Sequence, residues 1–259
     1  MSTTEERATE LGRLHEDERL LTLVNVWDVA SARVVAATPG TTALATASHA
    51  VAATFGFDDG EVIPRDLMLD MVGRVVASTH LPVTADLEAG YGDAGETVRR
   101  AIGLGVVGAN IEDELVPLSD AAARMAAVVA AAEAEGLPSF VLNARTDAFL
   151  RAGDRPSADV LADAVERGRA YLDVGAPCVF VPGALREDDI AALVSAFGPR
   201  RLSLIGLPGL PPRDRLEELG VARVSWGPMP QRVALTALQR MVEDLAAGGG
   251  APTDVRRLT

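Results

Sequence analysis

Two short apolar runs of this chain end in carboxylates that could hold a divalent cation. Residues 82–92 read Pro-Val-Thr-Ala-Asp-Leu-Glu-Ala-Gly-Tyr-Gly, and residues 108–113 read Gly-Ala-Asn-Ile-Glu-Asp. Side chains two apart on an extended strand point the same way, so Asp86 and Glu88 can face one ion, with Glu112 reaching it from the next strand. Oxygen ligands of this kind suit Mg²⁺ or Mn²⁺ better than zinc. The alternative is that these carboxylates cap helices or are solvated loop charges.

Other predicted strands also end in polar residues. Those residues are Asp28, the tripeptide Ala47-Ser48-His49, and Arg145 with Asp147. In a barrel of parallel strands, every strand delivers its last residues to the same face. The strand ends therefore predict one shared site.

Apolar runs alternate with helical patterns along the whole chain, without a linker-like stretch between them. Strands are predicted at residues 23–27, 42–47, 83–87, 108–112, 139–144, 178–181, 202–205 and 223–226. Helices are predicted at residues 29–37, 65–78, 94–104, 120–135, 158–174, 187–196, 214–219 and 231–247. A glycine follows a helical pattern just before a strand at Gly105, Gly136, Gly175, Gly198 and Gly220, as expected at helix ends.

Eight such units in 259 residues favour a closed (β/α)₈ TIM barrel over an open doubly wound sheet. The Gly-rich phosphate fingerprint of the open fold is absent after the first strand, where the chain reads Asp28-Val-Ala-Ser-Ala. We expect one barrel domain over residues 1–247, with a capping helix to about Glu18, and a flexible tail over residues 248–259.

Composition excludes several classes of partner. The formal charge of −13 disfavours nucleic acid and anionic membranes, which carry charge of the same sign. No apolar stretch reaches the roughly 20 residues that span a bilayer, and the polar start of the chain lacks a signal-peptide core, so we expect a cytoplasmic protein. The single cysteine, Cys178, lies in an apolar run and is interpreted as a buried structural thiol.

The motifs resemble the isocitrate lyase and phosphoenolpyruvate mutase superfamily, whose members carry Asp-x-Asp-x-Gly-Tyr-Gly and then Gly-x-x-Ile-Glu-Asp. Here the two elements occupy residues 86–92 and 108–113, with further matches at residues 25–32, 55–60 and 144–148. The resemblance extends from about Leu23 to Met241. It implies a Mg²⁺-dependent enzyme that makes or breaks a C–C or P–C bond of a small 2-oxo or 2-hydroxy acid, beside a pyruvate-like enolate.

The resemblance also implies residue roles. The metal shell would consist of Asp59, Asp86, Glu88 and Glu112, some of them acting through water. Arg145 would bind the substrate carboxylate and stabilise enolate charge, which suits its planar donor fork, although a surface salt bridge with Asp147 is an alternative. Substrate contacts are further expected from Trp27, Asp28, Ala47, Ser48 and Asp86. Ser48 and His49 join Arg145 as catalytic candidates, and for His49 a structural hydrogen-bonding role is equally open.

Several positions depart from the family pattern. Glu88 stands where the family usually has Asp, which would shift the ion or its waters. The lyases carry Lys-x-Cys-Gly-His on a mobile loop after the Glu-Asp pair, whereas residues 114–119 here read Glu-Leu-Val-Pro-Leu-Ser. The chain also has Val181-Pro182-Gly183 where relatives place Glu before Gly, and Ser203 where many place Asn. Cleavage of isocitrate or methylisocitrate is therefore not expected.

Three hypotheses follow. The preferred one is a metal-dependent C–C lyase, hydrolase or decarboxylase of a small 2-oxo acid, for which oxaloacetate-like decarboxylation is the simplest case. The second is phosphonopyruvate mutase or hydrolase chemistry on a phosphonate substrate, and the third is a metal- and carboxylate-binding barrel without turnover.

The last helical pattern predicts an assembly. An apolar stripe runs along it at Val233, Leu235, Leu238, Met241, Val242 and Leu245. Relatives often exchange C-terminal helices between subunits, which implies a homodimer or homotetramer; the alternative is a helix packed on its own barrel.

Overall fold

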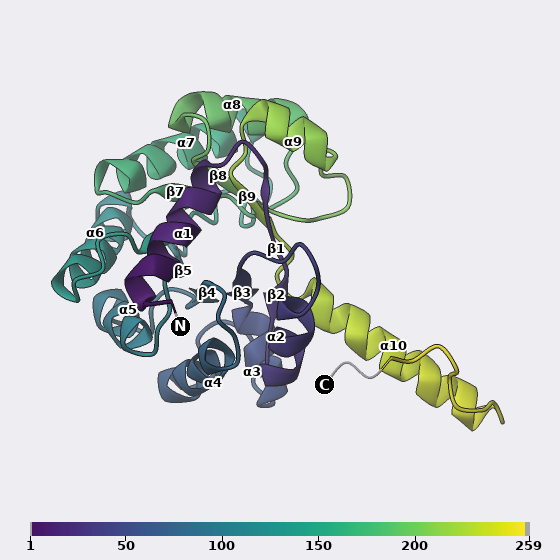
Figure 1. Ribbon diagram of the computed structural model, residues 1–259. Helices are drawn as coiled ribbons and strands as arrows, with labels where there is room; N and C mark the ends of the chain where they lie inside the picture. The colour runs from purple at the N-terminus through teal and green to yellow at the C-terminus, as the bar shows by residue number, and fades with distance from the viewer. Residues whose placement is uncertain (1, 257–259) are drawn as a thin grey trace.

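The strands of the computed structural model, which describes residues 2–256, form a ring of parallel strands surrounded by helices (Figure 1). The strands are β1 (Leu21–Leu23), β2 (Asn25–Val26), β3 (Leu44–Thr46), β4 (Val83–Asp86), β5 (Gly108–Glu112), β6 (Val141–Arg145), β7 (Cys178–Phe180), β8 (Leu202–Ile205) and β9 (Arg223–Ser225). Only Val24 separates β1 from β2, and these two halves of one strand pair with β9 and β3 respectively. The ring therefore closes through eight strand positions, and the predicted TIM-like barrel is confirmed.

The helices alternate with the strands as the sequence predicts. They are α1 (Thr4–Glu16), α2 (Val29–Ala36), α3 (Ser48–Thr54), α4 (Arg65–Ala77), α5 (Ala94–Gly103), α6 (Leu118–Ala134), α7 (Ser157–Asp173), α8 (Glu187–Phe197), α9 (Arg213–Leu219) and α10 (Met229–Ala246). The sequence did not predict α3, because two turns of mostly small residues are too short to show a helical period. Its position matters, since α3 begins directly at Ser48.

The amino-terminal helix α1 lies across one end of the barrel (Figure 1). Thr3 and Glu6 form a capping box at its start, and Leu11 and His15 are buried against the barrel. The core consists mainly of Val, Leu and Ala side chains, as the low aromatic content predicts. With this end covered by α1, the opposite end, where the strands terminate, is the mouth.

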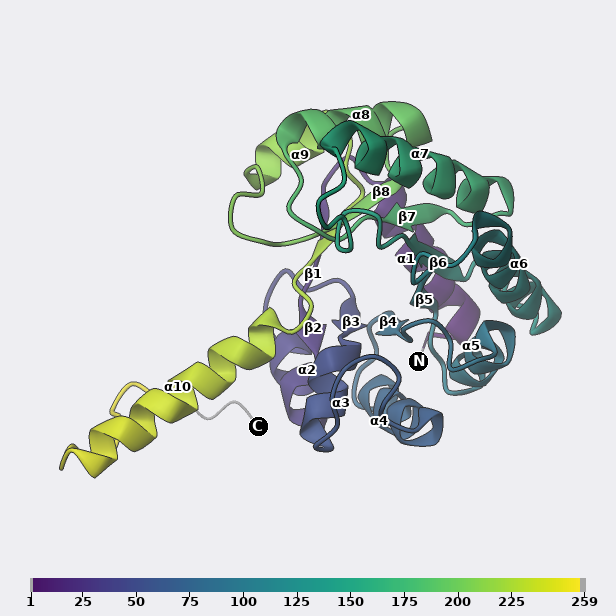
Figure 2. The same cartoon turned by 180° about the vertical axis from the view of Figure 1, so that it is seen from behind.

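The carboxyl-terminal helix α10 projects away from the barrel in both views (Figure 1, Figure 2). The domain limits, with a flexible tail from residue 248, stay a prediction. Within residues 2–256 no helix combines the length and apolar character needed to cross a bilayer. The cytoplasmic location also stays a prediction.

Candidate active site at the barrel mouth

Arg145 is the best-defined cation at the mouth. It is the last residue of β6, and the register places it opposite Glu112 at the end of β5. Its Nη1 lies 2.6 Å from Glu112 Oε2, and its Nε donates to Asp147 Oδ1 at 2.7 Å. Burial opposes its charge, but Glu112 and Asp147 raise the pKa of Arg145 above its usual value. The pair with Asp147 therefore exists, but it is a buried one that fixes the guanidinium, and not a surface salt bridge.

Asp86 forms a second anchor with Ser48. Asp86 ends β4, and its Oδ2 accepts hydrogen bonds from the Ser48 backbone N–H at 3.0 Å and the Ser48 hydroxyl at 2.9 Å. The same hydroxyl lies 3.4 Å from Asp59 Oδ1, and His49 Nδ1 lies 3.5 Å from Asp59 Oδ2. Four of the predicted site residues are thus in direct contact. The Ser48 amide, which we expected to bind substrate, is engaged by Asp86 in this arrangement.

Glu88 lies in a strained turn after β4. Its φ is +53°, and Gly90, Tyr91 and Gly92 also have positive φ values. The Glu88 side chain is 3% exposed, and within the described residues neither carboxylate oxygen has a hydrogen-bond partner. Burial, and then the charges of Asp86 and Asp59, raise the pKa of Glu88 to about 8. Strain of this kind is characteristic of functional sites.

The donor set fits a magnesium ion. A buried carboxylate with unpartnered oxygens is costly unless a cation or a proton neutralises it, and here Asp86 and Asp59 add further negative charge. No three His, Cys, Asp or Glu side chains among residues 2–256 are grouped closely enough to hold one ion directly. Mg²⁺ does not require this, because it keeps several waters and commonly takes one or two carboxylates.

Burial and the charge of Arg145 shift the pKa of Glu112 in opposite directions. Burial raises its pKa to about 7, although Arg145 opposes this shift. Its backbone N–H donates to the Glu88 carbonyl at 2.8 Å, which ties the strained turn to β5. In the structure Glu112 is therefore a partner of Arg145, beside the acidic cluster of Asp59, Asp86 and Glu88.

A cavity of about 270 Å³ opens at the mouth between these residues. Of the predicted site residues, it is lined by Ala47, Ser48, His49, Asp59, Asp86 and Arg145. Its volume suits a small molecule, below the range of drug-sized ligands. Glu88 and Glu112 lie beside the cavity without lining it.

Two of the predicted substrate contacts lie elsewhere. Asp28 caps α2, where its Oδ1 accepts the Ser31 backbone N–H at 2.7 Å. Trp27 packs against the larger core cluster, and neither residue lines the cavity. The helix-cap alternative weighed for strand-end carboxylates thus describes Asp28.

Sequence reasoning missed four polar residues that line the cavity, Asn25, Asn110, Ser225 and Arg232. Asn25 joins the closing strands, because its side chain donates to the Thr46 carbonyl and accepts from the Trp226 N–H, each at 2.8 Å. The signal for Asn25 and Asn110 was available, since both are amides inside otherwise apolar strands. Arg232 carried a weaker signal, its place in the first turn of a helix after the last strand.

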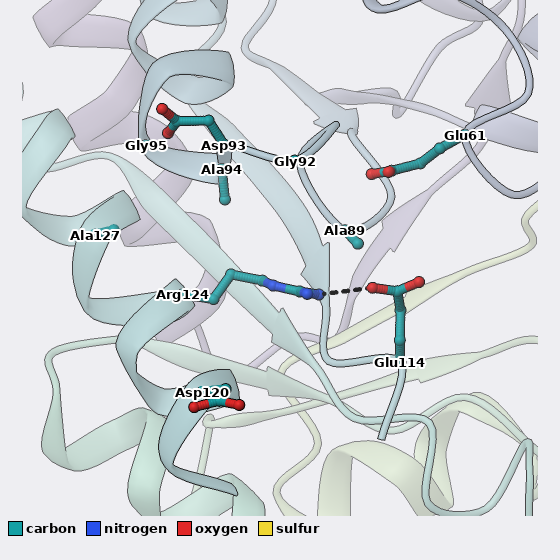
Figure 3. Close-up of a pocket in the computed structure, with 10 residues that line it drawn as sticks. All are labelled: Glu61, Ala89, Gly92, Asp93, Ala94, Gly95, Glu114, Asp120, Arg124 and Ala127. Carbon is teal, nitrogen blue, oxygen red and sulfur yellow. Dashed lines mark hydrogen bonds and ion pairs between the residues drawn. The ribbon is translucent and has the colours of Figure 1, made fainter. Parts of the chain in front are cut away.

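The segment that follows the Glu112-Asp113 pair is held by contacts with α6 and α7. Pro117 precedes α6, and Asp113 is fully buried, accepting from the Tyr171 hydroxyl at 2.7 Å and Arg167 Nη1 at 3.2 Å. Arg124 of α6 donates to the Glu112 carbonyl at 2.6 Å and pairs with Glu114 at 3.1 Å, beside a second cavity of about 360 Å³ (Figure 3). The helix predicted at residues 120–135 is confirmed as α6, which begins two residues earlier, at Leu118.

The remaining sequence expectations concern the barrel interior. Cys178 is 1% exposed and burial raises its pKa to about 12, so the interpretation as a structural thiol is confirmed. Ser203 is buried and accepts from Asn143 at 3.3 Å without lining the cavity, whereas Pro182 and Gly183 do line it.

The sequence of the chain is similar to those of several known proteins. Residues 11–246 match the family model for phosphoenolpyruvate phosphomutase. An uncharacterised protein of Mycobacterium tuberculosis is 33% identical over 244 residues, covering 93% of this chain and 91% of its own length. An oxaloacetate decarboxylase of Bradyrhizobium is 29% identical over 258 residues, with coverages of 93% and 85%.

The structure is also similar to solved structures of other proteins. A protein from Burkholderia cenocepacia, provisionally described as a phosphonomutase, superposes with a TM-score of 0.87 at 39% identity, covering 93% of this chain and 99% of its own. An oxaloacetate acetylhydrolase superposes with a TM-score of 0.85 at 26% identity, covering 97% and 92%.

Proposed function

The chain belongs to the phosphoenolpyruvate phosphomutase family, within the isocitrate lyase superfamily of enzymes, and we propose that it breaks a C–C bond of a small 2-oxo acid through a pyruvate-enolate-like intermediate. The superfamily consists of lyases and mutases that act on small carboxylates. The observation that carries the proposal is Arg145, held between two carboxylates and facing the same 270 Å³ cavity as Asp86 and Asp59. A cation and an acidic cluster on one small cavity suit a substrate with a carboxylate beside a carbonyl.

Substrate binding would begin at Arg145. Its guanidinium presents a planar donor fork, and its contacts with Glu112 and Asp147 restrict the side chain before substrate arrives. Asp86 and Asp59, with Glu88 and Glu112 directly or through water, would hold Mg²⁺ or Mn²⁺. When bound, the ion withdraws electrons from the 2-oxo group and stabilises the enolate.

Decarboxylation of oxaloacetate is the simplest reaction for this equipment. The C3–C4 bond breaks, its electron pair stays on C3 as the pyruvate enolate, and carbon dioxide leaves. The enolate carbon then takes a proton. His49 lines the cavity within 3.5 Å of Asp59 and is the candidate donor, with Ser48 holding Asp86 in place.

A second candidate is P–C bond chemistry on phosphonopyruvate. The observation that favours it is the 39% identity to the Burkholderia protein. Ser48 and His49 would then contact the phosphoryl group. A barrel that binds metal and carboxylate without turnover remains the third hypothesis, favoured by the absence of Lys, Cys and His from residues 114–119.

One experiment separates the three. The purified protein is incubated with Mg²⁺ and either oxaloacetate or phosphonopyruvate, and ¹H and ³¹P NMR follow the products. We expect pyruvate from oxaloacetate above the rate of Mg²⁺ alone, lost with chelator and in Arg145→Ala. Conversion of phosphonopyruvate alone would support the second candidate, and binding of both without turnover would support the third.

We also propose that the protein assembles into a homodimer or homotetramer through α10. The helix projects from the barrel, and Leu235, Leu238 and Val242 on it are each more than half exposed. Apolar side chains in this number on a projecting helix favour burial against a second copy.

A further inference from the structure

The barrel mouth contains a second arginine, which differs from Arg145 in having no carboxylate partner among the described residues. Arg232 lies in the first turn of α10 and lines the same cavity as Arg145. Within residues 2–256, its guanidinium makes no ion pair and no hydrogen bond, whereas Arg145 is paired with two carboxylates. Arg232 is therefore a second cation of this cavity, and unlike Arg145 it has no carboxylate partner among the described residues.

The position of Arg232 is fixed by the residue before it. Gln231 is buried, and its Nε2 donates to the Ala50 carbonyl at 2.9 Å and lies 3.3 Å from Thr54 Oγ1, both on α3. At the end of β9, the Trp226 N–H donates to Asn25 at 2.8 Å. The first turn of α10 is thus attached to α3, the strand end before it is attached to β2, and the rest of the helix projects beyond the barrel (Figure 2).

The two arginines line the same cavity, and an apolar arc of its wall lies between their strands. Arg145 ends β6 and Arg232 follows β9, so they are separated by β7 and β8 in the ring. The cavity wall along that arc is formed by Phe180, Pro182, Ile205 and Leu207. A ligand that spans the arginines would place an apolar carbon segment against this wall and an anionic group at each end.

We propose that Arg232 binds the second anionic group of the substrate and so determines its class, a short 2-oxo or 2-hydroxy acid that carries a second carboxylate. This inference rests on the proposed function. A monocarboxylate would leave Arg232 without a partner. A dicarboxylate gains a charge-assisted hydrogen bond to Arg232, which is stronger than a hydrogen bond between neutral groups.

The test compares malate with lactate, two stable 2-hydroxy acids that differ by one carboxylate group. Affinities are measured by calorimetry in the presence of Mg²⁺ for the wild type, Arg232→Ala and Arg232→Lys, with oxalate as the probe of the Arg145 and metal site alone. Arg240→Ala is the matched control, because it removes the same charge from the same helix and Arg240 does not line the cavity.

We expect the wild type to bind malate at least ten times more tightly than lactate. Arg232→Ala should reduce that ratio to within about threefold and Arg232→Lys should retain part of it, with oxalate affinity unchanged in both and all values unchanged in Arg240→Ala. A wild type that binds oxalate but shows no preference for malate, or an Arg232→Ala variant that keeps the preference, would overturn the role of Arg232. Failure of the wild type to bind oxalate would instead overturn the proposed function on which it rests.

Discussion

Single side chains at the mouth differ in how their charge is compensated. Arg145 lies between two carboxylates, which leaves its guanidinium oriented and partly accessible to substrate. The Glu88 carboxylate has no hydrogen-bond partner among the described residues and has acidic neighbours. A bound cation would therefore offset the free-energy cost of burying its charge. The first arrangement is pre-organised for an anion and the second for a metal ion.

At the opposite end of the barrel, His15 predicts how stability depends on pH. Burial, and then the charge of Arg223, lower the pKa of His15 to about 4. An unfolded chain titrates this group near pH 6.5, so between the two values only the unfolded state binds the proton and stability falls as the pH falls. The loss between pH 7.5 and pH 5 should be about 2 kcal/mol from this group.

Urea unfolding of the wild type and His15→Leu at both pH values measures this contribution. The variant should lose about 2 kcal/mol less than the wild type on acidification, because it lacks the group that protonates. Equal losses in the two proteins would show that His15 is not held neutral by its surroundings.

Among the elements, the turn after β4 places the acidic cluster. Gly90 has a φ of +95°, and a Cβ at this position would lie 2.4 Å from the Ala94 Cα at the start of α5. Gly90→Ala should therefore destabilise the fold by about 2 kcal/mol or more and displace Glu88. Gly12→Ala is the control, because a Cβ there on α1 meets no atom within 4 Å and should stabilise by roughly 0.5–1 kcal/mol.

Denaturant unfolding of both variants gives the comparison, and Mg²⁺ titration of Gly90→Ala reports on the turn. A Gly90→Ala protein as stable as Gly12→Ala would contradict the close packing of this turn on α5.

Elements with a strong period were predictable, and short ones were not. The strand-end motifs predicted that Asp86, Glu112 and Arg145 lie at the same end of the barrel, because parallel strands terminate on one face. Helix α3 was not predicted, because seven residues are too few to show a helical period. The hydrogen bond from the Ser48 amide to Asp86 was therefore not predicted either. Asp28 caps α2, and its predicted contact with substrate stays a prediction, because an N-cap and a ligand at a strand end have the same sequence signature.

For the whole molecule, the most prominent exposed apolar surface lies on α10. The helix has 18 residues, and beyond its first turn it projects from the barrel and carries exposed apolar side chains. Sequence predicted the stripe but not the projection, because helical periodicity specifies a face and not its partner.

For a homodimer or homotetramer formed through α10, size-exclusion chromatography with light scattering should give a mass of at least two chains. Leu238→Glu combined with Val242→Glu should reduce that mass to one chain, because two charges would be buried at the interface. Arg240→Glu, which a helical spacing of 100° places on the opposite side, should leave the mass unchanged. A wild type that elutes as a single chain at micromolar concentration would contradict the assembly.

The most direct test of a metal-dependent 2-oxo-acid site is thermal unfolding with oxalate, a mimic of the pyruvate enolate, with and without Mg²⁺. We predict a rise in Tm only when both are present, of about 5 °C when oxalate reaches about 100 times its Kd. The rise should be absent in Arg145→Ala, judged against that variant's own unliganded Tm. No shift at millimolar concentrations of both ligands would contradict the assignment of the barrel mouth as a working site.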